Sequence, residues 1–212
     1  MLWLVFVLKM CDSHGHCEHA HVAEDAVDLY SLYKFIDMEN LVCLNESAPD
    51  SGKKVFKPFE ERKDSSVFVE SDVDEELLFN IPFTGSVKLK GIIIAGENGD
   101  THPSSVAIYK NRPFMTFSDT EAEADQCLEL HPDPTGEITY PLKVLKFGNV
   151  QHLGLHIMKN FGAECTRIHY IGLKGDFIQA RRQEIVITNY EVKPNVADHK
   201  LDMLKTSGHL IE

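Results

Sequence analysis

Short apolar runs, separated by glycine, proline, asparagine and aspartate, fill most of the chain from residue 67 onward. Valine, isoleucine, phenylalanine and tyrosine dominate these runs, which is typical of β-strands. Apolar positions also alternate in several of them: Leu153, Leu155 and Ile157 share one face, which indicates a strand with one side toward a core. The runs cover residues 67–69, 77–81, 87–94, 106–109, 114–117, 127–130, 137–140, 144–147, 150–157, 166–173 and 184–190.

No helical pattern lies between these runs, which argues against a parallel sheet with helical crossovers. Many short strands with turn residues between them are typical of antiparallel sandwiches. The sequence therefore predicts an all-β protein, an antiparallel β-sandwich of the jelly-roll type.

The chain before residue 67 has a different pattern. Leu29, Leu32, Tyr33 and Ile36 recur at helical spacing, which predicts a short N-terminal helix with Asp28 as its N-cap. Proline, glycine and mixed charges predict a loop over residues 45–66. We expect three parts: a flexible His-rich N-terminal tail (1–27), one domain (28–190) and a C-terminal tail (191–212).

The apolar segment at residues 2–8 is too short for a membrane span, which needs about 20 residues. It also lacks a preceding cationic residue and a small-residue cleavage site, so we do not expect it to be a signal peptide. Translation from Met10 would remove it, and we hypothesise that residues 1–9 are not translated.

The charge balance of the 212 residues is acidic, with 21 Lys plus Arg against 33 Asp plus Glu and a net charge of -12. Acidic surfaces repel nucleic-acid phosphates and anionic lipid, so we expect protein partners, with no direct nucleic-acid and no membrane binding. The charge is uneven: residues 11–50 hold nine acids and one base. The avoidance of phosphates is therefore a weaker inference for the domain than for the whole chain.

The five cysteines are an odd number and include no Cys-x-x-Cys pair. This pattern fits a reducing compartment better than a disulfide framework. We therefore expect a protein of a reducing compartment such as the cytoplasm.

The His-rich stretch offers the first candidate for metal chemistry. His14, His16, His19 and His21 are ligand types for zinc, copper or nickel. No second ligand pair lies at the separation that a closed zinc site requires, and a solvated tail explains the stretch better. We keep these four histidines as weak metal candidates and expect no cofactor.

The acidic run from residue 70 to 76 is the second candidate. A calcium loop counted from Asp72 would put Leu77 where glycine is required and Phe83 where a bidentate glutamate is required, so the calcium template fails. Several acids without a base are typical of an exposed face. We expect a partner-binding patch formed by Glu70, Asp72, Asp74, Glu75 and Glu76.

Catalytic motifs do not emerge from the sequence. It contains no G-x-S-x-G, H-E-x-x-H or G-x-x-x-x-G-K-[ST] motif. His152 and His156 lie four apart in a predicted strand, about 13 Å along the chain and too far apart to share one metal. We therefore expect a protein that is not an enzyme.

Four collinear stretches together resemble the PITH domain family, whose module forms the C-terminal part of a proteasome-interacting thioredoxin-like protein. They are CLNES at 43–47, FVESDVDEELL at 68–78 continuing to IPF at 81–83, MTFSDTEAE at 115–123, and FGNV at 147–150 through NFGAECTRI at 160–168 to IGLKG at 171–175. The resemblance implies a β-sandwich jelly roll like the galactose-binding-like domains, and binding to the 26S proteasome in cytoplasm and nucleus. This chain lacks the thioredoxin half and its Cys-x-x-Cys motif, which excludes reductase activity.

Three functional hypotheses remain. The first is a monomeric, non-enzymatic protein-binding module that associates with the 26S proteasome or acts as a regulatory adaptor. The second is a regulator of gene expression or differentiation, including transcription, that acts indirectly through protein partners. The third is carbohydrate or small-ligand binding through the sandwich loops, which the position of the sole tryptophan, Trp3, outside the domain disfavours.

Overall fold

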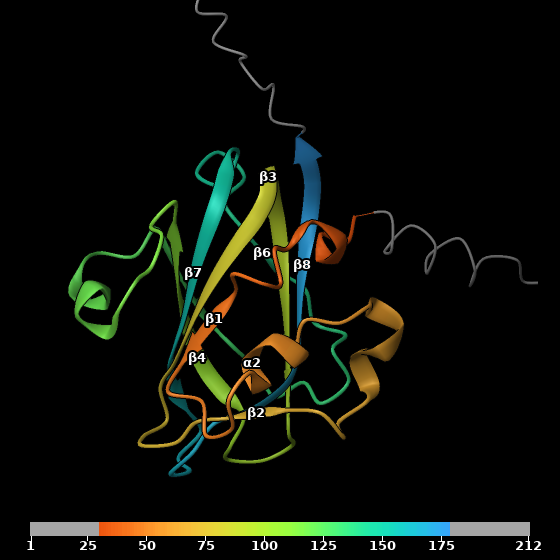
Figure 1. Ribbon diagram of the computed structural model, residues 1–212. Coiled ribbons are helices and arrows are strands. Elements are labelled where there is room, and N and C mark those ends of the chain that lie inside the picture. The colour runs from red at the N-terminus through yellow and green to blue at the C-terminus, as the bar shows by residue number, and fades with distance from the viewer. Residues whose placement is uncertain (1–29, 179–212) are drawn as a thin grey trace, which may run out of the picture. The chain divides into compact units, whose positions relative to one another are not determined.

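Antiparallel strands form the framework of residues 30–178, the part of the chain that the computed structural model describes. The strands are β1 (Val42–Leu44), β2 (Val69–Glu70), β3 (Leu77–Gly96), β4 (Pro103–Lys110), β5 (Gln126–Glu129), β6 (Tyr140–Pro141), β7 (Val150–Asn160) and β8 (Arg167–Ile178). Four short helices accompany them: η1 (Tyr33–Phe35), α2 (Ser51–Lys54), η2 (Phe59–Lys63) and η3 (Phe117–Glu121). The strands pair in the order β2-β8-β3-β7-β4-β5, and β1 and β6 also pair with β3 (Figure 1).

Strand β3 connects the two layers of the sandwich. Its first part, Leu77 to Pro82, pairs with β7 and in part with β1, whereas its second part, Ser86 to Gly96, pairs with β8. The pairing of β3 with β7 becomes irregular between Pro82 and Val87. Proline cannot donate a ladder hydrogen bond, so Pro82 ends the first run of regular pairing. Figure 1 shows β3 turning over near its label at the top of the picture.

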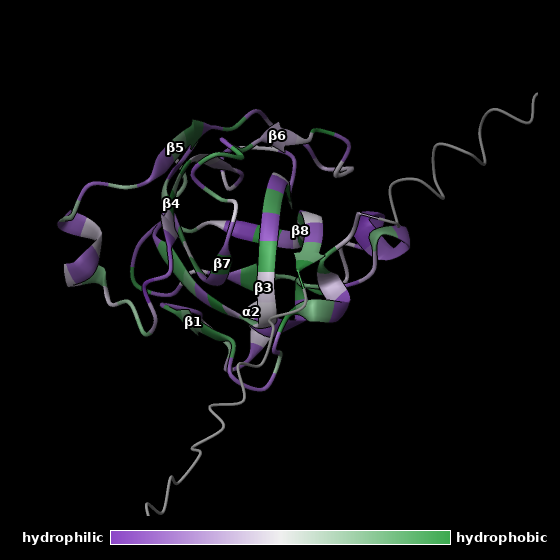
Figure 2. Ribbon diagram, turned by 90° about the horizontal axis from the view of Figure 1, so that it is seen from above, coloured by the Kyte–Doolittle hydropathy of each residue, from purple (hydrophilic) through white to green (hydrophobic). Residues whose placement is uncertain are grey.

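The core lies between these two parts of β3. Phe79 and Ile81 from the first part and Ile92 and Ile94 from the second are all buried in one hydrophobic cluster. Alternate residues along each strand point inward, as the sequence pattern predicted. Figure 2, which looks down on the strands, shows them arranged around this core.

A second, smaller cluster covers part of the outer side of the layer formed by β1, the first part of β3, β7 and β4. Leu78, Ala107 and Tyr109 point outward there and pack with Met115, which lies in the segment before η3. Gly154 leaves the space for this packing, because a Cβ atom at that position would lie 2.6 Å from the Met115 Sδ atom. The 111–125 segment therefore covers only part of this outer surface.

Phe114, next to Met115, has a positive φ of 55° and an 83% exposed side chain. Left-handed backbone is unfavourable for a bulky residue, whereas glycine adopts it freely. We therefore expect Phe114→Gly to keep or raise the free energy of unfolding, by up to about 1 kcal/mol. Urea denaturation of the full chain measures this, with Phe117→Gly as a contrasting variant that should destabilise, since Phe117 packs against the small cluster.

The antiparallel β-sandwich predicted from the sequence is confirmed. The predicted runs 77–81 and 87–94 belong to the single strand β3, and the runs 106–109, 127–130, 150–157 and 166–173 overlap β4, β5, β7 and β8. The predicted runs 67–69 and 137–140 share only their last residue with the short strands β2 and β6. The run 184–190, both tails and the domain boundaries lie outside the described residues.

Other predictions were wrong. The N-cap predicted at Asp28 lies outside the described residues. From residue 30 onward the predicted helix is reduced to the single 3-10 turn η1, because Ser31 and Ile36 on either side of it bridge to Lys174 and Phe83. The predicted loop at 45–66 contains α2 and η2, and β1 was missed. Residues 114–117 and 144–147 are not strands: the first segment covers the sheet, and the second forms a turn in which the Phe147 N–H donates to the Lys143 carbonyl (3.1 Å).

Within residues 30–178, no helix is long and apolar enough to cross a membrane.

Candidate functional site

Three loops meet at the end of the sandwich at which strands β3 and β8 both begin. The loops comprise residues 71–76, 97–102 and 161–166. Backbone hydrogen bonds join them: the Ser71 N–H donates to the Thr166 carbonyl (3.1 Å), and the Phe161 N–H donates to the Asp100 carbonyl (3.1 Å). The acidic run of the sequence is thus one side of a continuous three-loop surface, called the acidic end below.

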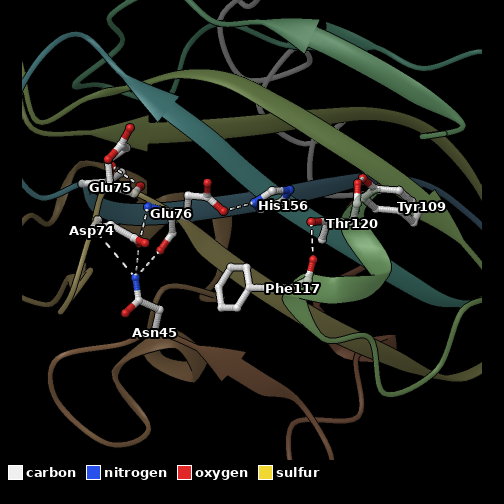
Figure 3. A network of polar contacts seen from close by, with 9 residues as sticks. Asn45, Asp74, Glu75, Glu76, Tyr109, Phe117, Thr120 and His156 are labelled. Carbon is white, nitrogen blue, oxygen red and sulfur yellow. Dashed lines mark hydrogen bonds and ion pairs between the residues drawn. The ribbon is translucent and has the colours of Figure 1, made fainter. Parts of the chain in front are cut away.

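Asn45 holds the first of these loops in place (Figure 3). Its side-chain amide donates to the Asp74 carboxylate (2.7 Å) and to the Glu76 carbonyl (2.7 Å), and its oxygen accepts from the Val73 N–H (3.1 Å). Asn45 itself has a positive φ of 66°, a conformation that asparagine tolerates better than most residues. These contacts give the acidic loop a defined conformation before any partner binds.

Glu76 points away from the loop surface toward β7 (Figure 3). Its carboxylate lies 2.9 Å from Nε2 of His156, whose side chain is buried. The His156 ring meets the edge of Phe117 in η3, with ring centroids 5.9 Å apart. Glu76 therefore links the loop to the outer cluster and is not free for a partner.

Glu70, at the other side of the loop, is also engaged. Its carboxylate accepts from the Cys165 thiol (3.1 Å) and pairs with Arg167 (3.2 Å), which pairs in turn with Glu97 (3.2 Å). The hydrogen bond from Cys165 and the pairing with Arg167 hold the pKa of the Glu70 carboxyl below its usual range. Glu70 therefore stays ionised and anchors β2 to β8.

The structure thus divides the five predicted partner-binding residues. Asp74, Glu76 and Glu70 organise the loop and its anchors, while the side chains of Asp72 and Glu75 have no hydrogen bond or ion pair within residues 30–178. The arrangement as a whole presents negative charge held on rigid backbone, and it contains no Lys or Arg in the three loops.

The neighbouring loops add residues that the sequence reasoning missed. Asp100 and Glu164 bring two further exposed carboxylates, and Val73 and Phe161 are exposed apolar side chains at 83% and 42%. Phe161 and Glu164 lie in one of the stretches that carried the family resemblance, which is the only signal that could have singled them out. Their proximity to the acidic run depends on strand pairing across almost 100 residues.

No metal centre is found among residues 30–178: no group of three His, Cys, Asp or Glu side chains there is placed to hold an ion. The weak candidates His14, His16, His19 and His21 lie outside the described residues. His152 and His156 both lie on the outer face of β7, and His156 is paired with Glu76.

Comparison with known sequences gives a consistent result. The family model of the PITH domain matches residues 23–194. The chain is 53% identical over 209 residues to PITH domain-containing protein 1 of Homo sapiens, covering 94% of this chain and 99% of that protein. It is 41% identical over 192 residues to PITH domain-containing protein 1 of Dictyostelium discoideum, covering 90% of this chain and 94% of that protein.

Comparison with solved structures concerns the fold alone. The CBM32-1 and CBM32-2 domains of ZmpB from Clostridium perfringens, in complex with GalNAc, match with a TM-score of 0.52 at 9% identity, covering 73% of this chain and 38% of that chain. Such a distant similarity says nothing about a shared ligand. It agrees with the antiparallel β-sandwich that the strand pairing shows.

Proposed function

This chain belongs to the PITH domain family, and from this premise we propose that it is a non-enzymatic protein-binding module that associates with the 26S proteasome through its acidic end. Membership of the family implies a proteasome-related protein-interaction module. The surface and the partner are the finer part of the proposal, together with a monomeric state and a location in cytoplasm and nucleus.

The acidic end is the observation that carries the proposal. It combines free carboxylates with two exposed apolar side chains, Val73 and Phe161, on loops that are already ordered by hydrogen bonds. Ordered loops lose little conformational entropy on binding, and protein interfaces combine apolar contacts with polar and charged groups. The complementary partner surface is a basic segment around an apolar pocket.

The test is affinity purification of the full chain from cell extract, with proteasome subunits quantified. Neutralising three free acids, as Asp72→Asn with Glu75→Gln and Asp100→Asn, is expected to reduce recovered proteasome about tenfold, because electrostatic attraction across the interface is lost. Asp74, Glu76 and Glu70 stay unchanged, so the loop keeps its conformation.

The matched control removes the same charge elsewhere, at the exposed residues Glu60, Glu61 and Glu129, each changed to Gln. It should leave recovery unchanged. Recovery of no proteasome above background by the unmodified chain would refute the partner. Equal recovery by the two triple variants would refute the acidic end as the binding surface.

A further inference from the structure

The outer side of the layer built from β1, the first part of β3, β7 and β4 is covered only in part. Leu78, Tyr109 and Met115 close one portion of it. The remaining portion is a groove of about 530 Å³, within the usual size range of ligand-binding clefts. Val42 and Leu44 of β1, Pro82 of β3 and His152 of β7 line it together with the segment 112–116. None of these groups belongs to the acidic end.

One wall of the groove is apolar, exposed and held in place. Val42 is 42% exposed and Phe114 is 83% exposed. The segment that carries Phe114 is fixed to β3 by Asn80, whose side chain donates to the Met115 carbonyl (2.9 Å) and accepts from the Met115 N–H (2.9 Å). The positive φ of Phe114 is thus imposed by surrounding contacts, as is common at ligand clamps.

A positively charged side chain, that of Arg112, lies at the β4 side of the same groove. The guanidinium of Arg112 lies 5.0 Å from the centroid of the Tyr109 ring and donates to the Glu123 carbonyl (3.1 Å). It has no carboxylate within ion-pair distance among residues 30–178. The nearby Asp119 carboxylate accepts from the N–H and the hydroxyl of Thr116 (2.8 Å each), and these two hydrogen bonds, with a smaller contribution from Arg112, lower its pKa. Arg112 can therefore still donate hydrogen bonds to the carboxylate of a bound partner.

The β1 side of the groove has the opposite charge. Asp37 lies there, and its carboxylate accepts from the Asn40 side chain (2.8 Å). Strands β3 and β7 separate Asp37 from Arg112. An occupant with a carboxylate would therefore be attracted to the Arg112 side and repelled from the Asp37 side, which gives it one orientation.

We infer that this groove is a second docking surface, which binds an extended segment of a partner protein carrying an acidic residue beside a bulky apolar one. The carboxylate pairs with Arg112, and the apolar side chain packs against Val42, Pro82 and Phe114. Arginine suits this role because its planar fork binds carboxylates through two hydrogen bonds. The chemistry is the reverse of that at the acidic end, so one molecule can contact a basic and an acidic partner segment at the same time.

The experiment uses the full chain labelled with ¹⁵N and three synthetic peptides: acetyl-GDLFG-amide, acetyl-GNLFG-amide and acetyl-GKLFG-amide. Amide shifts of Val42, Leu44, Phe114 and Met115 are followed by NMR during titration. The Asp peptide should shift these amides and bind about tenfold more tightly than the Asn peptide, with the Lys peptide weakest. If none of the three peptides shifts these amides, the inference is overturned.

Variants separate the two parts of the site. Arg112→Gln should make the Asp and Asn peptides equal in affinity, and Arg112→Lys should restore part of the preference. Phe114→Gly should weaken the binding of both peptides, although it does not destabilise the fold. Lys143→Gln, which removes an exposed positive charge outside the groove, should change nothing. A preference for Asp that survives Arg112→Gln would overturn the assignment of Arg112.

A second copy of this chain is the competing occupant, because Asp72, Val73 and Asp74 form an exposed acidic and apolar segment. Sedimentation over a wide range of protein concentration decides between a partner segment and a second copy as the occupant of the groove. Self-association that shifts the groove amides and disappears in Asp72→Asn would overturn the inference in favour of a contact between copies. A concentration-independent monomer that binds the Asp peptide supports it, whatever the outcome at the acidic end.

Discussion

Asp133→Ala is expected to lower the free energy of unfolding by about 3 kcal/mol, the largest single-residue effect that we predict. The Asp133 side chain is only 3% exposed. Its carboxylate accepts from the Ile138 N–H (2.6 Å) and from both the N–H and the hydroxyl of Thr135 (3.1 Å each). Alanine would leave these half-buried donors without an acceptor, and the 133–138 loop would lose its organising group.

Urea denaturation at neutral pH measures this loss, and two variants interpret it. Asp133→Asn keeps one acceptor oxygen and should cost less than Asp133→Ala. Glu137→Ala, in the same loop, removes an exposed carboxylate that forms a 3.7 Å pair with Lys63, and it should change stability by less than about 0.5 kcal/mol. A similar cost for Asp133→Ala and Glu137→Ala would contradict the structural role of Asp133.

Acidification below about pH 6.5 is expected to destabilise the fold through two buried histidines. Burial lowers the pKa of His102 and of His169, so both rings stay neutral in the folded state below the pH at which they become charged in the unfolded chain. The unfolded state then binds more protons, and stability falls as pH falls. The loss is about 1.4 kcal/mol per pH unit for each histidine, from the unfolded pKa down to the folded one.

The position of His102 explains why it remains neutral. Its side chain is fully buried; Nε2 accepts from the Asp133 N–H (3.0 Å), and Nδ1 lies 2.8 Å from the Pro103 carbonyl. An imidazolium would have no acceptor for a proton on Nε2. The Asp133 carboxyl adds to the acid sensitivity at lower pH. Burial raises its pKa, but the hydrogen bonds that it accepts lower it further, so that the pKa is below the usual value. The contribution of Asp133 to the free energy of unfolding is therefore lost as pH falls through this lowered pKa.

Thermal and urea unfolding of the full chain between pH 8 and pH 5 tests this dependence. His102→Gln retains an acceptor toward the Asp133 N–H and should flatten the pH profile, at some cost in stability at pH 8. His131→Gln, at an exposed position, is the control and should leave the slope unchanged. Stability that does not change between pH 7.5 and pH 5 would contradict the prediction.

Strand positions could be predicted from the sequence because they depend on local periodicity. Leu153, Leu155 and Ile157 alternate with outward-facing residues, and they do point into the core. The same reasoning failed for residues 30–36, where Leu32 and Ile36 occupy helical spacing but are buried by extended backbone around one 3-10 turn. Spacing shows which residues are buried but not which backbone brings them there.

The candidate site could be predicted only in part. The acidic run was visible, and Asp72 and Glu75 are free at the surface. However, the local sequence pattern does not show that Glu76 pairs with His156. It does not show either that Asp100 and Glu164 belong to the acidic end. Arg112 was not noticed either, because its value as an anion-binding group depends on what lies within 4 Å of it in the fold.

The sequence by itself determined the class of the fold, the approximate strands and an acidic segment near the start of the sandwich, because side-chain alternation and composition are local properties of a chain. Only the tertiary structure decided which carboxylates are free and where an apolar groove opens. These features rest on contacts between distant residues: Asn45 meets Asp74 across 29 positions, and Glu76 meets His156 across 80. Such contacts form when strands pair, and no nearby residue specifies them.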